Sequence, residues 1–200
     1  MRMCFGFHLS KNVNKIFASL VYCVVRKLAN SELERKSAEE FRSAEKLPII
    51  LVMDNVRSAY NVGSVFRTAD AFPVVAIYLC GISCHPPHKE ITKTALGAEN
   101  AVAWKYFKTT IEAIKEIKEL GYKSFAVEQA EKSIPLQNFR LQTSDFRLAL
   151  VFGHEVNGVQ QEIIDVCNGC IEIPQGGTKH SLNIAVSVGV VLWEFFREKK

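Results

Sequence analysis

Residues 48–79, PIILVMDNVRSAYNVGSVFRTADAFPVVAIYL, decide the fold class of this chain. The run at 49–53 is continuously apolar, which is typical of a strand that is buried on both faces. Residues 61–71 follow with apolar side chains at helical spacing, and residues 74–79 form a second apolar run. A strand, a helix and a strand in this order predict a parallel β-α-β unit.

The same alternation continues toward the carboxyl end of the chain. It predicts further strands at 102–104, 123–127, 148–152 and 170–173, and helices at 109–120, 160–166 and 182–197. We therefore expect an α/β fold whose mostly parallel sheet is flanked by helices. In such sheets, ligands bind at the carboxyl ends of the strands.

Residues 1–46 differ from the rest of the chain. Residues 31–46 are charged and helical in pattern, and Ser31 with Glu34 predicts a capping box at their start. We expect an N-terminal extension with a leading helix over 1–46 and one domain over 47–200.

The run at 16–25 (IFASLVYCVV) follows basic residues, so its layout resembles the core of a secretory signal. No small-residue cleavage site follows it, and a docking helix or a dispensable leader is the favoured alternative. Val25 is a candidate for the true start of the chain. No stretch has the length of a membrane-spanning helix.

Composition narrows the class of protein. The chain has 200 residues, 48% of them hydrophobic and 23% charged, which is the profile of a globular domain. Its formal net charge of +4 is compatible with an anionic partner but does not require one. The six cysteines are scattered, so we expect reduced thiols and a cytoplasmic location.

Several common chemistries lack their sequence signals. Neither the G-x-G-x-x-G dinucleotide fingerprint, nor the P-loop, nor the G-x-S-x-G elbow of hydrolases occurs. A zinc site among Cys80, Cys84, His85 and His88 has unusual spacing, so we expect no metal. A redox pair at Cys167 and Cys170 is equally disfavoured, because this pair falls at a helix end and not at an activating N-terminus.

Polar residues gather in three loops that follow predicted strands. After the first, Asn61 stands at a probable helix start, Gly63 permits close approach, and Arg57 and Arg67 form a cation pair suited to phosphate. The alternative is a capped helix with a surface arginine.

The loop GHEVNGV at 153–159 is typical either of an anion- or nucleotide-binding turn or of a tight strand-to-helix turn. In the third loop, Ser181 is a candidate cap for the last helix. Ala185, Ser187 and Gly189 then give that helix a small-residue surface, suited to a dimer interface or to core packing.

Three motifs carry a family resemblance: NVGSVFRTADAF at 61–72, LVFGHEVNGV at 150–159 and IEIPQGGTKHSLNIAVSV at 171–188. In this order and spacing they resemble the SpoU (TrmH-like) RNA 2′-O-ribose methyltransferases of the SPOUT superfamily. The segment at 88–99 also fits the loop that precedes the family's Gly-Ala turn. The resemblance extends over residues 47–199.

The resemblance implies a C-terminal trefoil knot, a rare exception to unknotted connections. It also implies a homodimer, bound S-adenosylmethionine, and methyl transfer to a ribose 2′-OH of tRNA or rRNA. DNA is not an expected substrate because it lacks this hydroxyl. Other branches of the superfamily methylate base nitrogens, and a non-catalytic RNA-binding protein on the same fold is a further alternative.

The resemblance transfers roles to positions that match the motifs. The cofactor-lining positions are Val127, Gly153, Ile173 and Leu182, with Ser181 beside them. The catalytic and motif-supporting positions are Asn61, Arg67, Glu155, Ser181 and Asn183. Gln175 departs from the pattern, because many relatives carry Met there.

The family's motif arginine is often described as the base, but an arginine side chain stays protonated in proteins. We therefore expect Arg67 to hold an RNA phosphate and to stabilise the developing alkoxide. Asn61 would orient this arginine or the ribose. Glu155 would fix the loop or contact a partner subunit.

Overall fold

The computed structural model describes residues 25–140 and 146–199. These residues divide into two compact units, with the boundary between Arg35 and Lys36. In the first unit, η1 (Asn30–Glu32) is a single 3-10 turn, and Arg26 forms an ion pair with Glu32. The signal-like run that ends at Val25 lies almost entirely outside the described residues. No helix in the described part of the chain is long and apolar enough to cross a membrane.

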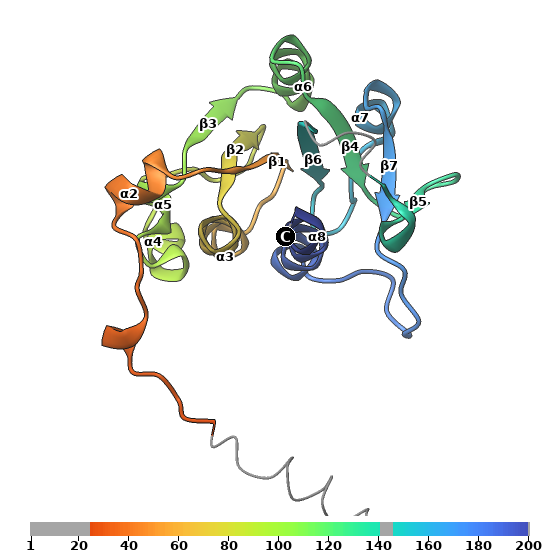
Figure 1. The fold of residues 1–200 in the computed structure, drawn as a ribbon. Helices are drawn as coiled ribbons and strands as arrows, with labels where there is room; N and C mark the ends of the chain where they lie inside the picture. The colour runs from red at the N-terminus through yellow and green to blue at the C-terminus, as the bar shows by residue number, and fades with distance from the viewer. Residues whose placement is uncertain (1–24, 141–145, 200) are drawn as a thin grey trace, which may run out of the picture. The chain divides into compact units, whose positions relative to one another are not determined.

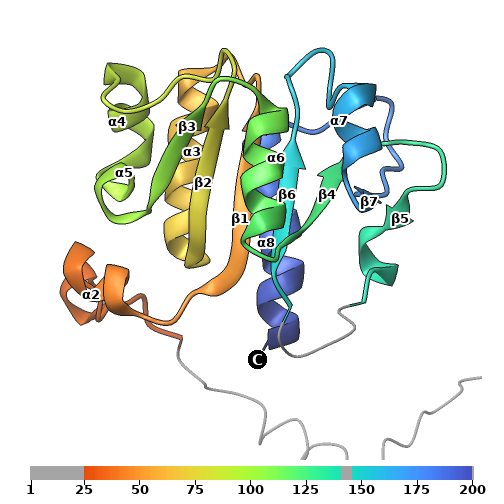
Figure 2. The same ribbon diagram turned by 90° about the horizontal axis from the view of Figure 1, so that it is seen from above.

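The second unit is built on a parallel sheet of seven strands in the order β3-β2-β1-β6-β4-β7-β5 (Figures 1 and 2). The strands are β1 (Leu47–Asp54), β2 (Val74–Cys80), β3 (Trp104–Phe107), β4 (Lys123–Val127), β5 (Ile134–Pro135), β6 (Leu148–Phe152) and β7 (Gly169–Glu172). The predicted α/β class and parallel sheet are confirmed. The trefoil threading stays a prediction.

Helices cover both faces of the sheet (Figure 1). One layer holds α3 (Ala59–Ala71), α4 (Lys89–Ala95), α5 (Ala98–Ala101) and α8 (Ile184–Lys199), and the other holds α6 (Thr110–Glu119) and α7 (Gln161–Val166). Two short helices, α2 (Ala38–Ser43) and η2 (Leu136–Asn138), add Phe41 and Leu136 to the core on the α3 and α8 side.

Alternation along β1 explains why its sequence is apolar throughout. Ile49, Leu51 and Met53 join the core under α3 and α8, whereas Ile50 and Val52 join the core under α6 and α7. Every one of these side chains is at most 1% exposed. Burial of both faces removes the polar alternation that a half-exposed strand would show.

Three predicted caps are wrong, and each has a local replacement. Ser37, and not Ser31, caps the leading helix, with Glu40 in place of Glu34 closing the capping box. The Ser58 hydroxyl accepts from the Asn61 amide, so Asn61 is the third residue of α3 and not its cap.

At α8, the Asn183 carbonyl oxygen accepts from the amides of Ala185 and Val186. Asn183 therefore fills the capping role that was predicted for Ser181.

Helices α4 and α5 were not predicted, because their ends lack the usual residues. The His88 ring accepts from the Glu90 amide at the start of α4, and Leu96 ends it with a φ of 53°. The strand predicted at 102–104 begins later, at Trp104, and is β3. Val102 cannot belong to it because Val102 is the C-cap of α5. Close approach at Gly63 is confirmed: a Cβ there would lie 2.5 Å from the carbonyl oxygen of Ile91 in α4.

Candidate active site

A cleft of about 840 Å³ lies where β4, β6 and β7 end. This volume falls within the range of small-molecule sites. The five residues predicted to line a cofactor all border it: Val127, Gly153, Ile173, Ser181 and Leu182. Their assignment to a cofactor stays a prediction, but they come from three separate loops and meet at one cavity.

The loop after β6 forms one wall of the cleft. Its ends pair backbone to backbone, with the amide of His154 donating to the carbonyl of Gly158 and the reverse bond closing the pair. The His154 ring accepts from the amide of Val156 at 3.1 Å and holds the turn. A Cβ at Gly153 would lie 2.1 Å from the carbonyl carbon of Gly158, so only glycine fits there. The tight strand-to-helix turn that the sequence predicted is therefore present.

Glu128 joins this loop to the end of β4. Its carboxylate accepts from the amides of Gln129 at 2.9 Å and Val159 at 3.0 Å. The amide side chain of Gln129 in turn donates to the carbonyl of His180, at 2.6 Å. These bonds connect all three loops that border the cleft, and Glu128 and Glu131 also place two carboxylates in its wall.

A hydrogen-bonded triad connects the three sequence motifs at the edge of the cleft. The Asn61 Nδ2 donates to Glu155 Oε1 at 3.2 Å, and the Asn183 Nδ2 donates to Asn61 Oδ1 at 3.1 Å. Glu155 also accepts from the backbone amides of Arg57 and Ser58. Three of the five predicted catalytic residues thus form one unit, which we call the Glu155–Asn61–Asn183 triad.

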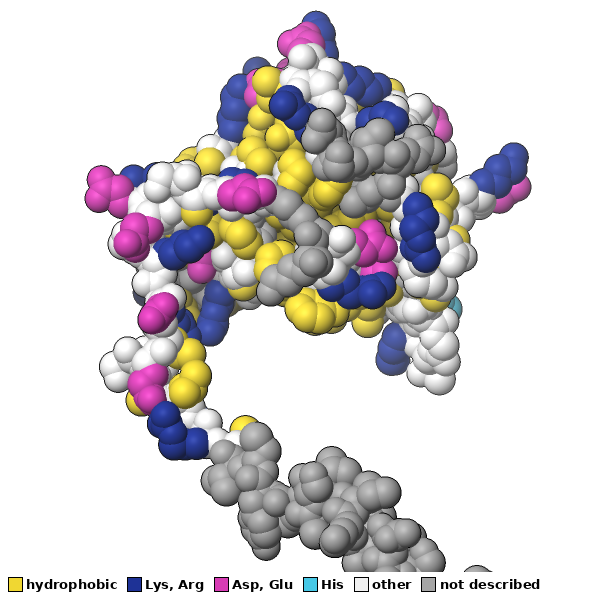
Figure 3. All heavy atoms as spheres, viewed as in Figure 1, with side chains coloured by type: hydrophobic (Ala, Val, Ile, Leu, Met, Phe, Trp, Pro, Cys, Tyr) yellow, Lys and Arg dark blue, Asp and Glu magenta, His cyan; other side chains and the backbone are white. Residues whose placement is uncertain are grey.

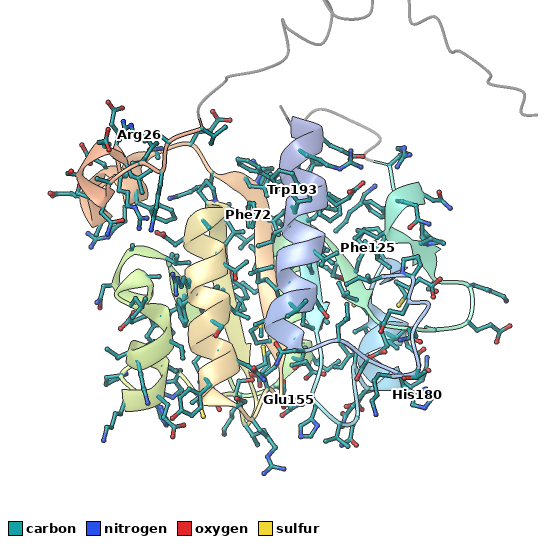
Figure 4. All side chains as sticks on the ribbon, turned by 90° about the horizontal axis from the view of Figure 1, so that it is seen from below. Arg26, Phe72, Phe125, Glu155, His180 and Trp193 are labelled. Carbon is teal, nitrogen blue, oxygen red and sulfur yellow. The ribbon has the colours of Figure 1, made fainter. Side chains whose placement is uncertain are left out.

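The environment of Glu155 favours its charged form. Burial raises the pKa of this carboxyl, but the hydrogen bonds it accepts, from the Ser58 amide first, outweigh burial and bring its pKa below the usual value. Figure 4 shows Glu155 and His180 at the same end of the molecule, the end where the cleft lies. The triad therefore holds a carboxylate in place beside the cleft.

The other two predicted catalytic residues stand apart from the triad. Ser181 borders the cleft and is exposed. Arg67 lies in a second depression of about 600 Å³, between α3, α4 and Gly189 of α8. Within the part of the chain that the structure describes, the Arg67 guanidinium has neither a hydrogen bond nor an ion pair, so it is available to an external anion.

The described residues contain no group of three or more His, Cys, Asp or Glu side chains that could hold a metal ion. Burial raises the pKa of the Cys80 thiol to about 12 and also raises the pKa of Cys167 and Cys170. These three thiols are therefore poorly suited to react as thiolates. All four described cysteines are free.

Sequence reasoning missed Glu128 and the role of His154 in the turn. Glu128 directly follows a predicted strand, so the rule that ligands meet strand carboxyl ends could have found it. No sequence signal could have shown that the His154 ring accepts hydrogen bonds from the turn, because those bonds depend on the geometry of the folded loop.

Comparison with known proteins adds to this geometry. A model of the SpoU rRNA Methylase family matches residues 48–193. The 23S rRNA (guanosine-2′-O-)-methyltransferase RlmB of Vibrio cholerae is 27% identical over 168 residues, which are 84% of this chain and 66% of that protein.

Two solved structures are also similar. The AdoMet-bound rRNA methyltransferase from Sinorhizobium meliloti has a TM-score of 0.71 at 26% identity, covering 79% of this chain and 60% of that one. The TrmH/SpoU tRNA modifying enzyme of A. aeolicus has a TM-score of 0.70 at 25% identity, covering 81% and 82%.

The chain spans 62–70% of the length of the first curated relatives that it matches. The family match, in contrast, covers most of the chain and includes all three motifs that carried the resemblance. That resemblance is confirmed, and the chain belongs to the SpoU rRNA Methylase family.

Proposed function

We propose that this chain transfers a methyl group from S-adenosylmethionine to a ribose 2′-OH of tRNA or rRNA. The observation that carries the proposal is the Glu155–Asn61–Asn183 triad, which joins three distant motifs at the rim of one cleft. The names of the relatives support this chemistry, since they include a guanosine-2′-O-methyltransferase and an AdoMet-bound rRNA methyltransferase.

The cleft has the chemical character that S-adenosylmethionine requires. Val127, Ile173 and Leu182 offer apolar surface for an adenine ring, and the loops offer backbone polar groups for its edges. Glu128 and Glu131 offer negative charge to a cationic ligand. When bound, this cofactor supplies a methyl group already activated by a positively charged sulfur.

The chain itself must position the ribose and assist the loss of the hydroxyl proton. A fixed carboxylate and two amide side chains in the triad hold the rim of the cleft in one geometry, which is the basis of catalysis by proximity. Among the described residues Arg67 has neither a hydrogen bond nor an ion pair, so its charge is free to hold a phosphate and to stabilise an alkoxide. Ser181, on the cleft wall, would contact the cofactor or the ribose.

We also propose that the chain forms a homodimer through α8. Val186, Val190 and Trp193 recur at helical spacing, and they are 51%, 39% and 55% exposed. In the space-filling view, apolar side chains reach the surface at α8 (Figure 3). An apolar stripe of this kind is typical of an interface, and Arg67 borders it near Gly189. A cytoplasmic location, where such RNAs are modified, is part of the same proposal.

The experiment combines the purified protein with S-adenosylmethionine and unmodified total RNA, followed by mass spectrometry of the nucleosides. A new 2′-O-methyl nucleoside that disappears with Arg67→Ala is the expected result. If the new methyl group were on a base, the chain would instead be a base-nitrogen methyltransferase. Failure to bind the cofactor, measured by calorimetry, would favour the non-catalytic RNA-binding alternative.

A further inference from the structure

Three aromatic rings gather beside the edge strand β3, outside the cleft, two from that strand and one from the loop after β2. The His85 ring stacks on Trp104 with ring centres 5.9 Å apart and an angle of 19°, and it also contacts Tyr106 at 5.1 Å. His85 is exposed, and Tyr106 is 41% exposed. Trp104 is half-buried against the core and supports the His85 ring. We call His85, Trp104 and Tyr106 the aromatic shelf.

The loop that carries His85 is bonded through Ser83 to the end of β1 and the loop that follows it, and Tyr106 bonds to the start of the His85 loop. Buried Ser83 accepts from the Val56 amide at 2.8 Å and donates to the Met53 carbonyl at 2.9 Å. The Tyr106 hydroxyl donates to the carbonyl of Gly81 at 3.0 Å. The rings are therefore organised before any ligand arrives, which lowers the entropic cost of binding.

The loop that carries His85 begins at the carboxyl edge of the sheet, as do the loops of the candidate active site. Tyr106 is one residue before the end of β3, and Trp104 is at its start. The loop after β1 carries Arg57 and Ser58, whose amides bind Glu155. The loop after β2 carries His85, and Cys84 contacts the carbonyl of Arg57. Since β6 and β3 are three strand positions apart, these two strands are separated by roughly 15 Å across the sheet. A few nucleotides of single-stranded RNA can bridge that distance.

Three cations near the carboxyl ends of β1, β2 and β3 match a phosphate backbone. Arg57, Lys89 and Lys108 are exposed, and none has an ion pair among the described residues. Arg57 lies in the loop after β1, and Lys108 lies in the loop after β3. Lys89 is the first residue of α4, directly after the loop that follows β2. Aromatic rings with neighbouring cations are the usual means by which proteins bind single-stranded nucleic acid without base pairing.

We propose that the aromatic shelf stacks an unpaired base of the RNA substrate, a few nucleotides from the ribose at the cleft. This proposal rests on the proposed function for the identity of the ligand, but base stacking can be measured without any methyl transfer. Stacking does not depend on base identity, so the shelf would position the RNA and would contribute little to choosing its sequence.

The test measures fluorescence anisotropy of a labelled short oligoadenylate and of an abasic strand of equal length. The ratio of the two dissociation constants reports the contribution of the bases, because both strands carry the same phosphates. We expect wild-type protein to prefer the oligoadenylate and His85→Ala/Tyr106→Ala to lose that preference by roughly 5- to 100-fold. The affinity for the abasic strand should stay the same.

Matched variants separate stacking from folding. Ile82→Ala removes a 61% exposed apolar side chain from the same loop and should keep the wild-type ratio. Tyr106→Phe keeps the ring but loses the bond to Gly81, so it should keep most of the preference that the double variant loses. If the double variant has a lower Tm, His85→Ala alone carries the test, because its ring is exposed and its only described hydrogen-bond contact is with the adjacent Pro86.

An unchanged ratio in a folded His85→Ala/Tyr106→Ala protein would overturn the proposal. Absence of any preference for bases in the wild type would do the same. A base-dependent ratio that falls as expected, in a protein that methylates no ribose, would support the shelf and would instead reject the proposed function.

Discussion

The side chain of Asn183 donates a hydrogen bond to that of Asn61 at 3.1 Å, across 122 residues of sequence. The same Asn183 caps α8 through its carbonyl oxygen, so one amide group uses its two ends for two tasks. The start of α8 is thereby fixed relative to the start of α3. Because Asn61 also donates to Glu155, the bond from Asn183 links the third motif to the first two.

The dual role of Asn183 can be divided by substitution. Asn183→Ala removes both the cap and the bond to Asn61, and we expect it to lower the free energy of unfolding by about 1–2 kcal/mol. Asn183→Ser restores a capping oxygen but is too short to reach Asn61, so it should recover most of the stability and little of the activity. Urea unfolding and methyl transfer measure the two effects. Equal activity in Asn183→Ser and wild type would show that the Asn61 bond is dispensable.

The charge of Glu155 makes stability depend on pH. Its pKa is lowered in the folded protein, so the carboxylate stabilises the fold above its unfolded pKa of about 4.3 and stops doing so as the pH falls through the folded value. We expect Glu155→Gln to be less stable than wild type near neutral pH, by less than about 1 kcal/mol because solvent screens this exposed side chain.

That difference should disappear once the pH is below both pKa values of the carboxyl. Denaturant unfolding of the two proteins at neutral and acidic pH checks it. A stability difference that grows on acidification would contradict the assigned direction.

Much of the fold was predictable because its strands are buried on both faces. The strands at 123–127 and 148–152 were predicted with the bounds that the structure has. The failures occurred where local chemistry is unusual, as at α4, which His88 caps and left-handed Leu96 ends. Strand β5 has two residues, Ile134 and Pro135, and is too short to produce any periodicity.

The candidate site was predictable in its residue types but not in its connections. The motifs identified Asn61, Glu155 and Asn183, yet nothing in the sequence indicated that they bond in series. That arrangement depends on how α8 packs against α3, which is a tertiary property. The position of Arg67 outside the cleft was likewise not predictable, because spacing along a helix does not say which cavity a side chain faces.

Gly153 offers a test of the cleft wall. A methyl group there would lie 2.1 Å from the carbonyl carbon of Gly158, and backbone atoms cannot move aside cheaply. We expect Gly153→Ala to destabilise the fold by about 1–3 kcal/mol and to weaken S-adenosylmethionine binding. Gly176→Ala is the matched control, since its Cβ would meet nothing within 4 Å. If calorimetry showed that Gly153→Ala binds S-adenosylmethionine with wild-type affinity, the tight turn at Gly153 would not be needed to shape the cofactor site.

The exposed stripe on α8 predicts the oligomeric state. Figure 4 shows Trp193 on α8 well away from Glu155, so a change there leaves the cleft intact. We expect Trp193→Glu to convert a dimer into a monomer, because a charge would be buried in an apolar interface. Leu120→Glu, at a 47% exposed position after α6, should leave the dimer unchanged. Light scattering after gel filtration distinguishes these outcomes, and a monomeric wild type would reject the interface.

Arg67 allows the mechanism itself to be tested. Because it lies outside the cleft, Arg67→Ala should leave S-adenosylmethionine affinity unchanged while methyl transfer falls roughly 100-fold or more. If Arg67 acts through its positive charge, Arg67→Lys keeps part of that charge effect and should retain measurable activity, although it loses the planar fork that binds phosphate. Single-turnover methylation, with RNA and cofactor binding measured alongside, separates the cases. Complete inactivity of Arg67→Lys with both ligands still bound would show that charge is not enough and that the guanidinium geometry, or its proton, takes part directly.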